Sequence, residues 1–325
     1  MDQKRVLVTG IGGNVGQGII RNIRSLQLPI EIIGCNTVAF TAGNHLCDKF
    51  FKVPFAYDED YIGIIGKIVE EEKVDLVIPS TDYEVYYLSK YKELIACEIA
   101  VSNVDTAEIY LDKYKSYLHH SQYGIPFAKA FLPSNYNQEF SETIVKPREG
   151  RGSRGLFFNP PGFTNFSDEY MVQELFKGNE ITTAFYVNKN NELHGFINLE
   201  RTLENGATNE CRVNREYDEK LEEILLQIIQ NSKIRGSANL QSIATEDGRI
   251  IPFEVNCRIS GTNSIRSNFG FEDVKYTIEE YLYDLPLSRP KIINGVAVRI
   301  MMDVIYAEQK DNSSILDNSV KHFLF

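Results

Sequence analysis

The chain has 325 residues with 43% hydrophobic and 24% charged side chains, and its formal net charge at pH 7 is −11. This length can bury a large core over two or three domains, and the composition is that of an ordinary globular protein. Nucleic acids and membrane surfaces attract basic patches, so the acidic balance argues against both as partners. The five cysteines are scattered without a CxxC pair, which is typical of reduced thiols, and we expect a cytoplasmic protein. No apolar run approaches the length of a membrane span, and the N-terminus leads into a strand rather than a signal peptide.

The N-terminal third has the pattern of an open α/β sheet. The expected elements are a strand at Lys4–Thr9, a glycine-rich turn at 10–18, a helix through Arg24, a strand at Glu31–Cys35, a helix at Asp58–Glu72 and a strand at Val74–Pro79. Ligands bind such sheets at the carboxyl ends of the strands. Thr81, Asp82 and Glu84 follow the third strand there, and we expect them either to line a substrate cleft or to act as polar caps.

The glycine-rich turn is also typical of dinucleotide-binding domains, and Tyr86 and Lys90 have a spacing found in reductases. The second strand region ends at Asn36, where an NAD enzyme usually has an acid for the ribose. We therefore favour a scaffold or a phosphate-sized anion site for the turn. An NAD(P)-dependent oxidoreductase stays as an alternative.

The middle of the chain combines helical and strand patterns with a basic, glycine-rich loop. A single helix is expected from Thr106 until Gly124-Ile-Pro126 ends it, and a short strand at Thr143–Val145 leads to Lys146. The loop 148–155 that follows contains three glycines, three arginines and Ser153, and such a loop can wrap around phosphates. The alternative is a solvated surface loop.

The region from 125 to 200 is expected to form a small β-rich subdomain. Its later elements are a strand at Met171–Phe176, a turn at Gly178–Glu180, and strands at Ile181–Val187 and Leu193–Arg201. Further along the chain we expect an amphipathic helix at Tyr217–Ile234, a helix at Val274–Tyr283 and a strand at Gly295–Met301, followed by a polar tail past about residue 308.

A β-hairpin is predicted around Asp247 and Gly248, because two runs rich in Ile, Val and Phe flank this strong turn signal. A two-residue turn places Gln241 opposite Glu254, and Asn239 opposite Asn256. A four-residue loop keeps this register, whereas a three-residue loop would break it.

The hairpin therefore gathers oxygen ligands on one face. Glu254 and Asn256 are two residues apart on one strand and share a face with Gln241. One carboxylate and two amide oxygens suit Mg²⁺. Arg258 follows on the same side and suits phosphate. The alternative is an ordinary amphipathic hairpin with a polar outer face.

Taken in order, these elements resemble the ATP-grasp superfamily, and in particular carbamoyl-phosphate-synthase-like members with one grasp module. The resemblance covers about residues 4–270. It is carried by the glycine turn, Asp112-Lys113, Ile144-Val-Lys-Pro147 with Ser153-Arg-Gly155, Val172-Gln-Glu-Leu175 with Gly178-x-Glu180, Gln241, and Glu254-Val-Asn-x-Arg258.

The resemblance implies an α/β fold in which a Rossmann-like pre-ATP-grasp domain precedes a two-lobed ATP-grasp module. The expected boundaries are 1–104 for the first domain, 105–290 for the ATP-grasp domain with a lid subdomain at about 125–200, and 291–325 for a C-terminal strand and tail.

The resemblance also assigns roles to single positions. Lys113 and Lys146 would neutralise the ATP phosphates, and the loop containing Ser153, Arg154 and Gly155 would fold over them as a lid. Adenine would be bound by Glu174, Leu175 and Phe176, and the ribose by Glu180. Gln241, Glu254 and Asn256 would hold two Mg²⁺ ions, for which Mn²⁺ is a substitute. The candidate catalytic residues are Arg258, Lys146 and Arg201, with Arg258 stabilising the transferring phosphoryl group.

The implied reaction joins a carboxylate to an amine, or to another nucleophile, through an acyl phosphate, with release of ADP and phosphate. Its partners are small-molecule substrates, and a homodimer is left open. Cys257 departs from the proline that is common in the family, and segment 201–215 matches no substrate-binding pattern. A full carbamoyl-phosphate synthase reaction is not expected, because the second module is missing. A non-catalytic ATP-sensing subunit is the main alternative.

Overall fold

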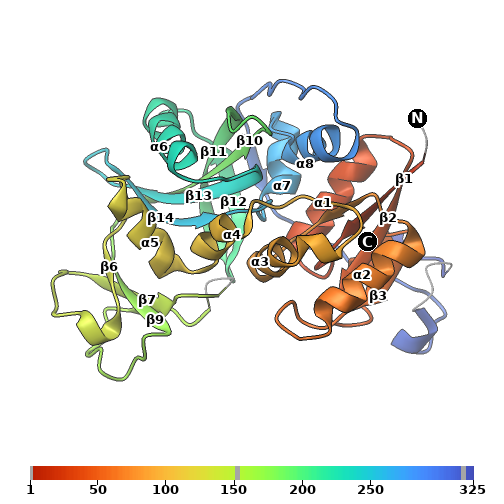
Figure 1. Cartoon of the computed structure of the whole chain (residues 1–325), viewed down its shortest axis with the longest axis horizontal. Helices are drawn as coiled ribbons and strands as arrows, with labels where there is room; N and C mark the ends of the chain where they lie inside the picture. The colour runs from red at the N-terminus through yellow and green to blue at the C-terminus, as the bar shows by residue number, and fades with distance from the viewer. Residues whose placement is uncertain (1–2, 151–153, 316–319) are drawn as a thin grey trace.

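A computed structural model describes residues 3–150, 154–315 and 320–325. It places an N-terminal α/β domain beside a larger antiparallel sheet, with a small sheet at the far end of the molecule (Figure 1). This confirms the predicted fold class. Within the described residues, no helix combines the length and the apolar character that a membrane crossing requires.

The N-terminal domain is built on a parallel sheet in the order β3-β2-β1-β4-β5. Its strands are β1 (Lys4–Val8), β2 (Ile30–Asn36), β3 (Lys49–Lys52), β4 (Leu76–Ile78) and β5 (Glu98–Ile99), and its helices are α1 (Asn14–Ser25), α2 (Tyr61–Glu72) and α3 (Asp82–Lys90). This strand order is the Rossmann order. The short strands β3 and β5 were not predicted.

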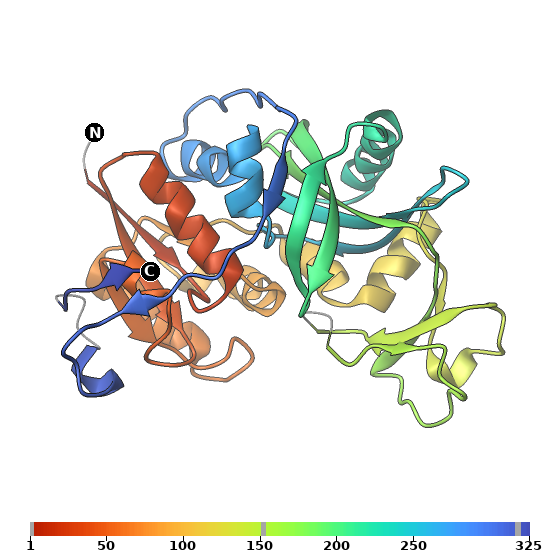
Figure 2. The same cartoon turned by 180° about the vertical axis from the view of Figure 1, so that it is seen from behind.

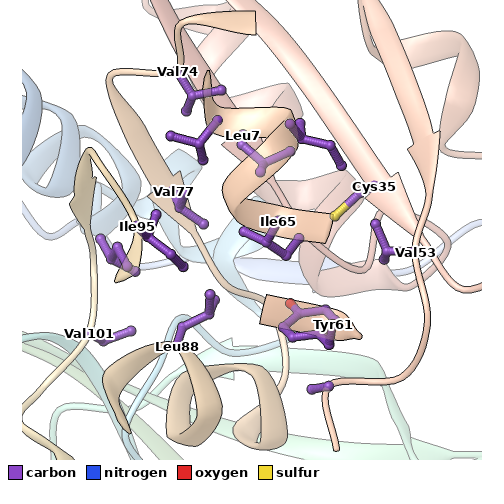
Figure 3. Close-up of a cluster of buried hydrophobic side chains, with 14 of the residues drawn as sticks. Leu7, Cys35, Val53, Tyr61, Ile65, Val74, Val77, Leu88, Ile95 and Val101 are labelled. Atoms are coloured by element: carbon purple, nitrogen blue, oxygen red, sulfur yellow. The ribbon is translucent and has the colours of Figure 1, made fainter. Parts of the chain in front are cut away.

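The first face of this sheet is covered by α2 and α3 (Figure 3). Tyr61 and Ile65 of α2 and Leu88 of α3 are buried against Leu7 and Val77 of the sheet. Complete burial of a large apolar side chain stabilises a fold by roughly 1.5–3 kcal/mol. This cluster therefore holds α3, whose N-terminus faces the site, firmly on the sheet.

The second face of the parallel sheet is shared between α1 and a segment from late in the chain. Helix α8 (Asp273–Thr277) continues as the π-helix Ile278–Leu282, and its residues Val274, Ile278 and Tyr281 pack with the core around Ile19 and Ile20 of α1. The C-terminal part of the second domain thus completes the core of the first.

The large sheet is antiparallel in the order β14-β13-β10-β11-β12-β15. Its strands are β10 (Asn179–Val187), β11 (Leu193–Glu204), β12 (Ala207–Val213), β13 (Gly236–Ala244), β14 (Ile250–Asn256) and β15 (Val296–Val298). Helix α6 (Asp218–Asn231) covers one face through Leu221, Leu225 and Ile228. The opposite face has an apolar core around Tyr186 and Tyr276 at one end and the polar residues of the site at the other.

The small sheet has the order β6-β9-β7-β8 and ends earlier along the chain than the lid boundary that we expected near residue 200. Its strands are β6 (Ala130–Phe131), β7 (Thr143–Pro147), β8 (Phe157–Phe158) and β9 (Tyr170–Glu174). Strands β10 and β11 lie within the expected lid range but belong to the large sheet. Sequence patterns identify strands without naming their partners, and this pairing is long-range.

The single helix that we predicted from Thr106 to Gly124 is in fact two, α4 (Val104–Leu111) and α5 (Lys113–Gln122). Asp112 separates them, because its carboxylate accepts hydrogen bonds from the backbone N–H groups of Tyr114 and Lys115, at 2.8 and 3.1 Å, and so acts as the N-cap of α5. The break makes Lys113 the first residue of a helix.

The predicted hairpin pairs are confirmed, but the turn is different. Gln241 lies opposite Glu254 and Asn239 opposite Asn256. The loop has three residues, closed by a 3.0 Å hydrogen bond from Thr245 N to Arg249 O, and Gly248 adopts a φ of 76°. Such a loop alone would shift the register. A β-bulge at Phe253 adds one residue to β14 and restores it.

The C-terminal segment crosses from β15 to the N-terminal domain (Figure 2). It ends in a small ladder of β16 (Val304–Ile305) and β17 (Phe323–Leu324). The Tyr306 ring contacts Phe40, and the His322 ring contacts His45. The end of the chain therefore rests on the first domain.

We predict that Asp273→Ala lowers the free energy of unfolding by about 3–5 kcal/mol. Asp273 and Arg266 form a fully buried ion pair, with Arg266 Nε 3.1 Å from Asp273 Oδ1, and the substitution leaves the guanidinium without its counter-charge. Urea unfolding of wild type and variant measures the difference. Glu71→Ala, which removes an exposed ion pair with Lys67, is the control and should hardly change the midpoint. An equally small change for Asp273→Ala would contradict this account.

Candidate active site

A cavity of about 270 Å³ lies between the small sheet and the site face of the large sheet. Most of the residues singled out from the sequence line it. These are Lys113, Lys146, Arg154, Glu174, Leu175, Phe176, Glu180, Gln241 and Glu254. Asn256 and Arg201 adjoin this group through hydrogen bonds, Gly155 lies next to Arg154, and Ser153 falls outside the described residues.

One part of the cavity is apolar. Ile144 of β7, Leu175 and Phe176 after β9, and Ile251 and Phe253 of β14 form its walls. Pockets of this kind, with flat apolar walls and a few polar groups, suit a heteroaromatic ring. In a regular strand, Phe253 and Glu254 would point to opposite faces, but the bulge turns both into the cavity.

The polar part of the cavity contains two lysines. Lys146 is buried, and its ammonium lies 5.3 Å from the centroid of the Phe253 ring. Burial lowers the pKa of Lys146 to about 8; Glu254 and Glu180 oppose this effect, and the neighbouring Lys113 adds to it. Lys113 donates a 3.2 Å hydrogen bond to Gly150 O in the loop after β7. Both lysines are placed to meet a polyanion.

Glu254 is the carboxylate between these lysines, with its Oε1 3.8 Å from Lys113 Nζ. Burial raises the pKa of Glu254, but Lys113, Lys146, a hydrogen bond from Asn256 and the charge of Arg258 together hold it below its ordinary value. Glu254 is therefore an ionised carboxylate, which is the form that binds a metal ion.

A chain of hydrogen bonds connects the predicted metal ligands to Arg201. Arg201 Nη2 donates to Gln241 Oε1 at 3.1 Å, Gln241 Nε2 donates to Asn256 Oδ1 at 3.1 Å, and Asn256 Nδ2 donates to Glu254 Oε1 at 3.0 Å. Arg201 Nε also donates to Glu180 Oε1 at 2.9 Å. The predicted ribose ligand and a predicted catalytic residue thus bind each other in this state.

The donor set fits Mg²⁺ that arrives together with a phosphate ligand. Among the described residues, no group of three or more His, Cys, Asp or Glu side chains could hold a metal alone. Glu254 supplies one charge, and Gln241 and Asn256 supply neutral oxygens. Mg²⁺ is commonly held by one or two carboxylates plus substrate phosphates and waters. These three residues would hold the ion at the phosphate end of the cavity.

In the segment expected to bind adenine, two backbone N–H groups already donate hydrogen bonds within the protein. Glu174 N donates to Lys129 O at 2.9 Å, and Leu175 N donates to Glu142 O at 3.0 Å. These bonds fix the path of the segment along the cavity. The guanidinium of Arg249 lies 5.8 Å from the centroid of the Phe176 ring.

The glycine-rich turn of the first domain serves close packing. A Cβ atom at Gly16 would lie 2.7 Å from Gly10 O, and one at Gly18 would lie 2.2 Å from Asn263 Oδ1. Helix α1 can approach its own turn and α7 (Asn263–Arg266) only because side chains are absent there. This supports the scaffold interpretation of the turn over the dinucleotide one.

Two acids expected at the cleft wall have different surroundings. Glu84 is buried and accepts hydrogen bonds from Thr9 Oγ1 at 2.7 Å and Thr81 N at 3.0 Å, while Thr81 Oγ1 accepts from Glu84 N. Glu84 and Thr81 form a capping box, so both act as polar caps, but of the start of helix α3 and not of the strand end that we expected. Asp82 instead accepts from Arg258 Nε at 3.0 Å and Nη2 at 2.8 Å.

Several residues of the site were not identified from the sequence. Phe253 enters the cavity through the bulge, and the buried Gln173 donates to Ala128 O at 3.3 Å behind it. Arg148, expected over the phosphates, donates instead from Nε to Asp112 Oδ2 at 3.0 Å and from Nη1 to Asp168 O at 3.0 Å. It fixes the small sheet to the start of α5.

Comparisons with known proteins agree with this architecture. Residues 6–101 match the family described as PylC-like, N-terminal domain, and residues 110–262 match the ATP-grasp domain. None of the curated proteins matches the chain in sequence. The two family matches show that the chain contains an ATP-grasp domain, which follows a PylC-like N-terminal domain.

Solved structures share the fold at low sequence identity. N5-carboxyaminoimidazole synthetase from Staphylococcus aureus, complexed with ADP, has a TM-score of 0.74 at 12% identity, over 92% of this chain and 82% of that one. L-amino acid ligase from Bacillus licheniformis has a TM-score of 0.68 at 13% identity, over 87% and 75%. The biotin carboxylase domain of the Hydrogenobacter thermophilus 2-oxoglutarate carboxylase, with MgADP and bicarbonate, has a TM-score of 0.69 at 14% identity, over 90% and 73%.

We predict that ATP binding weakens by about tenfold between about pH 7 and about pH 9. The pKa of Lys146 is lowered to about 8, so its ammonium is charged below that pH and loses its proton above it, when it no longer attracts the phosphates. Calorimetric titration with ATP across this range measures the effect. Lys146→Arg stays charged at every pH tested and should remove the dependence. If ATP affinity falls equally with pH in wild type and Lys146→Arg, another titrating group is responsible.

Proposed function

We propose that the chain is an ATP- and Mg²⁺-dependent ligase that joins a carboxylate to an amine through an acyl phosphate. The observation that carries the proposal is the half-buried Glu254 carboxylate beside Lys113 and Lys146, at the polar end of a cavity whose other end is apolar. One anionic oxygen donor with two cations suits a metal-bound triphosphate.

The protein's own residues would act on charge and position. Lys113 and Lys146 would neutralise the phosphate oxygens, and Gln241, Glu254 and Asn256 would hold Mg²⁺, which supplies charge neutralisation at the phosphates. Arg258 and Arg201 are the candidate catalytic cations for the charge that develops during transfer. Glu174, Leu175 and Phe176 would bind the base. Glu180, which now accepts a hydrogen bond from Arg201, would also accept one from the ribose.

The proposed ligation has two steps, formation of an acyl phosphate and its attack by the amine. A carboxylate oxygen attacks the γ-phosphorus, the bond to the bridging oxygen breaks, and ADP leaves with that electron pair. The amine then attacks the acyl carbon, the carbon–oxygen bond to phosphate breaks, phosphate leaves, and the nitrogen loses a proton to water. The loop 148–155, with Arg154 and Gly155, would exclude water from the acyl phosphate; Ser153 belongs to the same proposal.

The proteins of similar structure support the proposal of a nucleotide-dependent ligase. Two of them were solved with ADP or with MgADP and bicarbonate bound, and a third is an L-amino acid ligase. We propose that this chain likewise binds a nucleotide, and that its substrates are a small-molecule carboxylate and an amine. The domain limits of 1–104, 105–290 and 291–325 remain our proposal for its organisation, and a homodimer and a cytoplasmic location belong to the same proposal.

A second candidate is an ATP-sensing subunit without turnover. It is favoured by Gln241, a neutral residue that hydrogen-bonds to two other members of the site and leaves Glu254 as the single acid of the metal set. Such a subunit would bind ATP tightly and release no ADP in the presence of any acid.

We predict that purified protein releases ADP from Mg·ATP only with a particular acid, in a panel of amino acids, dipeptides and small carboxylates, each with and without ammonia. Glu254→Gln should lower this release by about 100-fold or more, because it removes the one charged oxygen ligand. A coupled assay for ADP measures both.

The matched control is Glu200→Gln. Glu200 lies on the same sheet with the same 19% side-chain exposure, but it binds Arg212 and Asn214 away from the cavity. This variant should keep wild-type turnover. ATP-induced thermal stabilisation without ADP release would favour the sensing subunit, and the absence of any ATP binding would overturn both candidates.

A further inference from the structure

The ion pair between Arg258 and Asp82 connects the first domain to the segment that follows the predicted metal ligands. Arg258 follows Asn256 just after the end of β14, and Asp82 is the first residue of α3, after β4. Their side chains are 14% and 15% exposed, so the pair is largely shielded from water. Asp82 is fixed in place because the capping box of Thr81 and Glu84 holds the start of α3.

The pair draws Arg258 toward the first domain. Arg258 is not one of the residues that line the nucleotide cavity. It is nevertheless close to the metal ligands: burial raises the pKa of Glu254, and the charge of Arg258 is among those that lower it. A rotation of the long arginine side chain could therefore exchange one anionic partner for another without any movement of the backbone.

The geometry of the pair leaves it open to competition. Arg258 Nε and Nη2 both donate to the same oxygen, Asp82 Oδ2, instead of forming two parallel bonds to two oxygens. Among the described residues, no donor contacts Asp82 Oδ1. An arginine binds a carboxylate best through the two-oxygen fork. A free carboxylate can therefore satisfy these two donors better than Asp82 does.

We propose that Asp82 is an internal stand-in for the substrate carboxylate: it holds Arg258 toward the first domain until the acid to be activated takes over its two N–H donors. The proposal rests on the ligase function. Asp82 acts through Arg258 and is a positioning residue. When the acid displaces Asp82, the carboxylate and the guanidinium arrive together beside the γ-phosphate. Without the acid, Arg258 stays occupied and ATP is protected from transfer to water.

The test is Asp82→Asn, assayed for ADP release with and without the acid that wild type selects. Loss of the competing charge should raise acid-independent release by about tenfold and lower the KM for the acid by about tenfold, with the KM for ATP unchanged. Asp82→Glu keeps the charge and should keep tight coupling. Asp75→Asn is the matched control, because Asp75 binds Lys4 and Arg5 N on the same domain, away from the site.

Several outcomes would overturn the proposal. If Asp82→Asn raises the KM for the acid or lowers kcat without raising acid-independent release, Asp82 aligns Arg258 for catalysis instead of withholding it. Asp82→Ser gives the same readout if the asparagine variant does not fold. If wild type releases ADP without any acid, Asp82 does not withhold Arg258, although the proposed nucleotide site would stand. Failure of wild type to release ADP with any acid would overturn the ligase function itself.

Discussion

A carboxylate that is largely shielded from water needs nearby positive charge, and at this site the carboxylate is Glu254. The cations come from two other elements, Lys113 at the start of α5 and Lys146 on β7. Burial alone would favour the neutral form of Glu254, and the charges of Lys113, Lys146 and Arg258 keep it ionised. Removing one member would leave the others uncompensated in a shielded space. The hairpin, the helix and the small sheet must therefore meet here for the site to exist.

Two local irregularities make that meeting possible. The bulge at Phe253 turns an aromatic ring and the Glu254 carboxylate into the same cavity, although neighbours on a regular strand point apart. The break at Asp112 begins a new helix with Lys113, and Arg148 then ties the small sheet to that break. Each irregularity positions a charged group at the polar end of the cavity, and the bulge also places Phe253 in its apolar wall.

Local patterns predicted much of this arrangement. The pairing of Gln241 with Glu254 was predicted from a two-residue turn at Asp247 and Gly248, and the strand leading to Lys146 from its apolar residues. The turn and the bulge were missed because a three-residue loop with one compensating extra residue gives the same pairing at the site. The capping box of Thr81 and Glu84 could have been recognised from its spacing. The pairing of Asp82 with Arg258 could not, because 176 positions separate them in sequence.

The central claim is that ATP activates a carboxylate at this site. The most direct measurement labels the carboxylate of the selected acid with a heavy oxygen isotope and follows the label by mass spectrometry during turnover. Attack on the γ-phosphorus makes one carboxylate oxygen part of the phosphate that is later released. The account predicts inorganic phosphate that contains one labelled oxygen for each ADP formed. Unlabelled phosphate would show that water receives the phosphoryl group, and would contradict it.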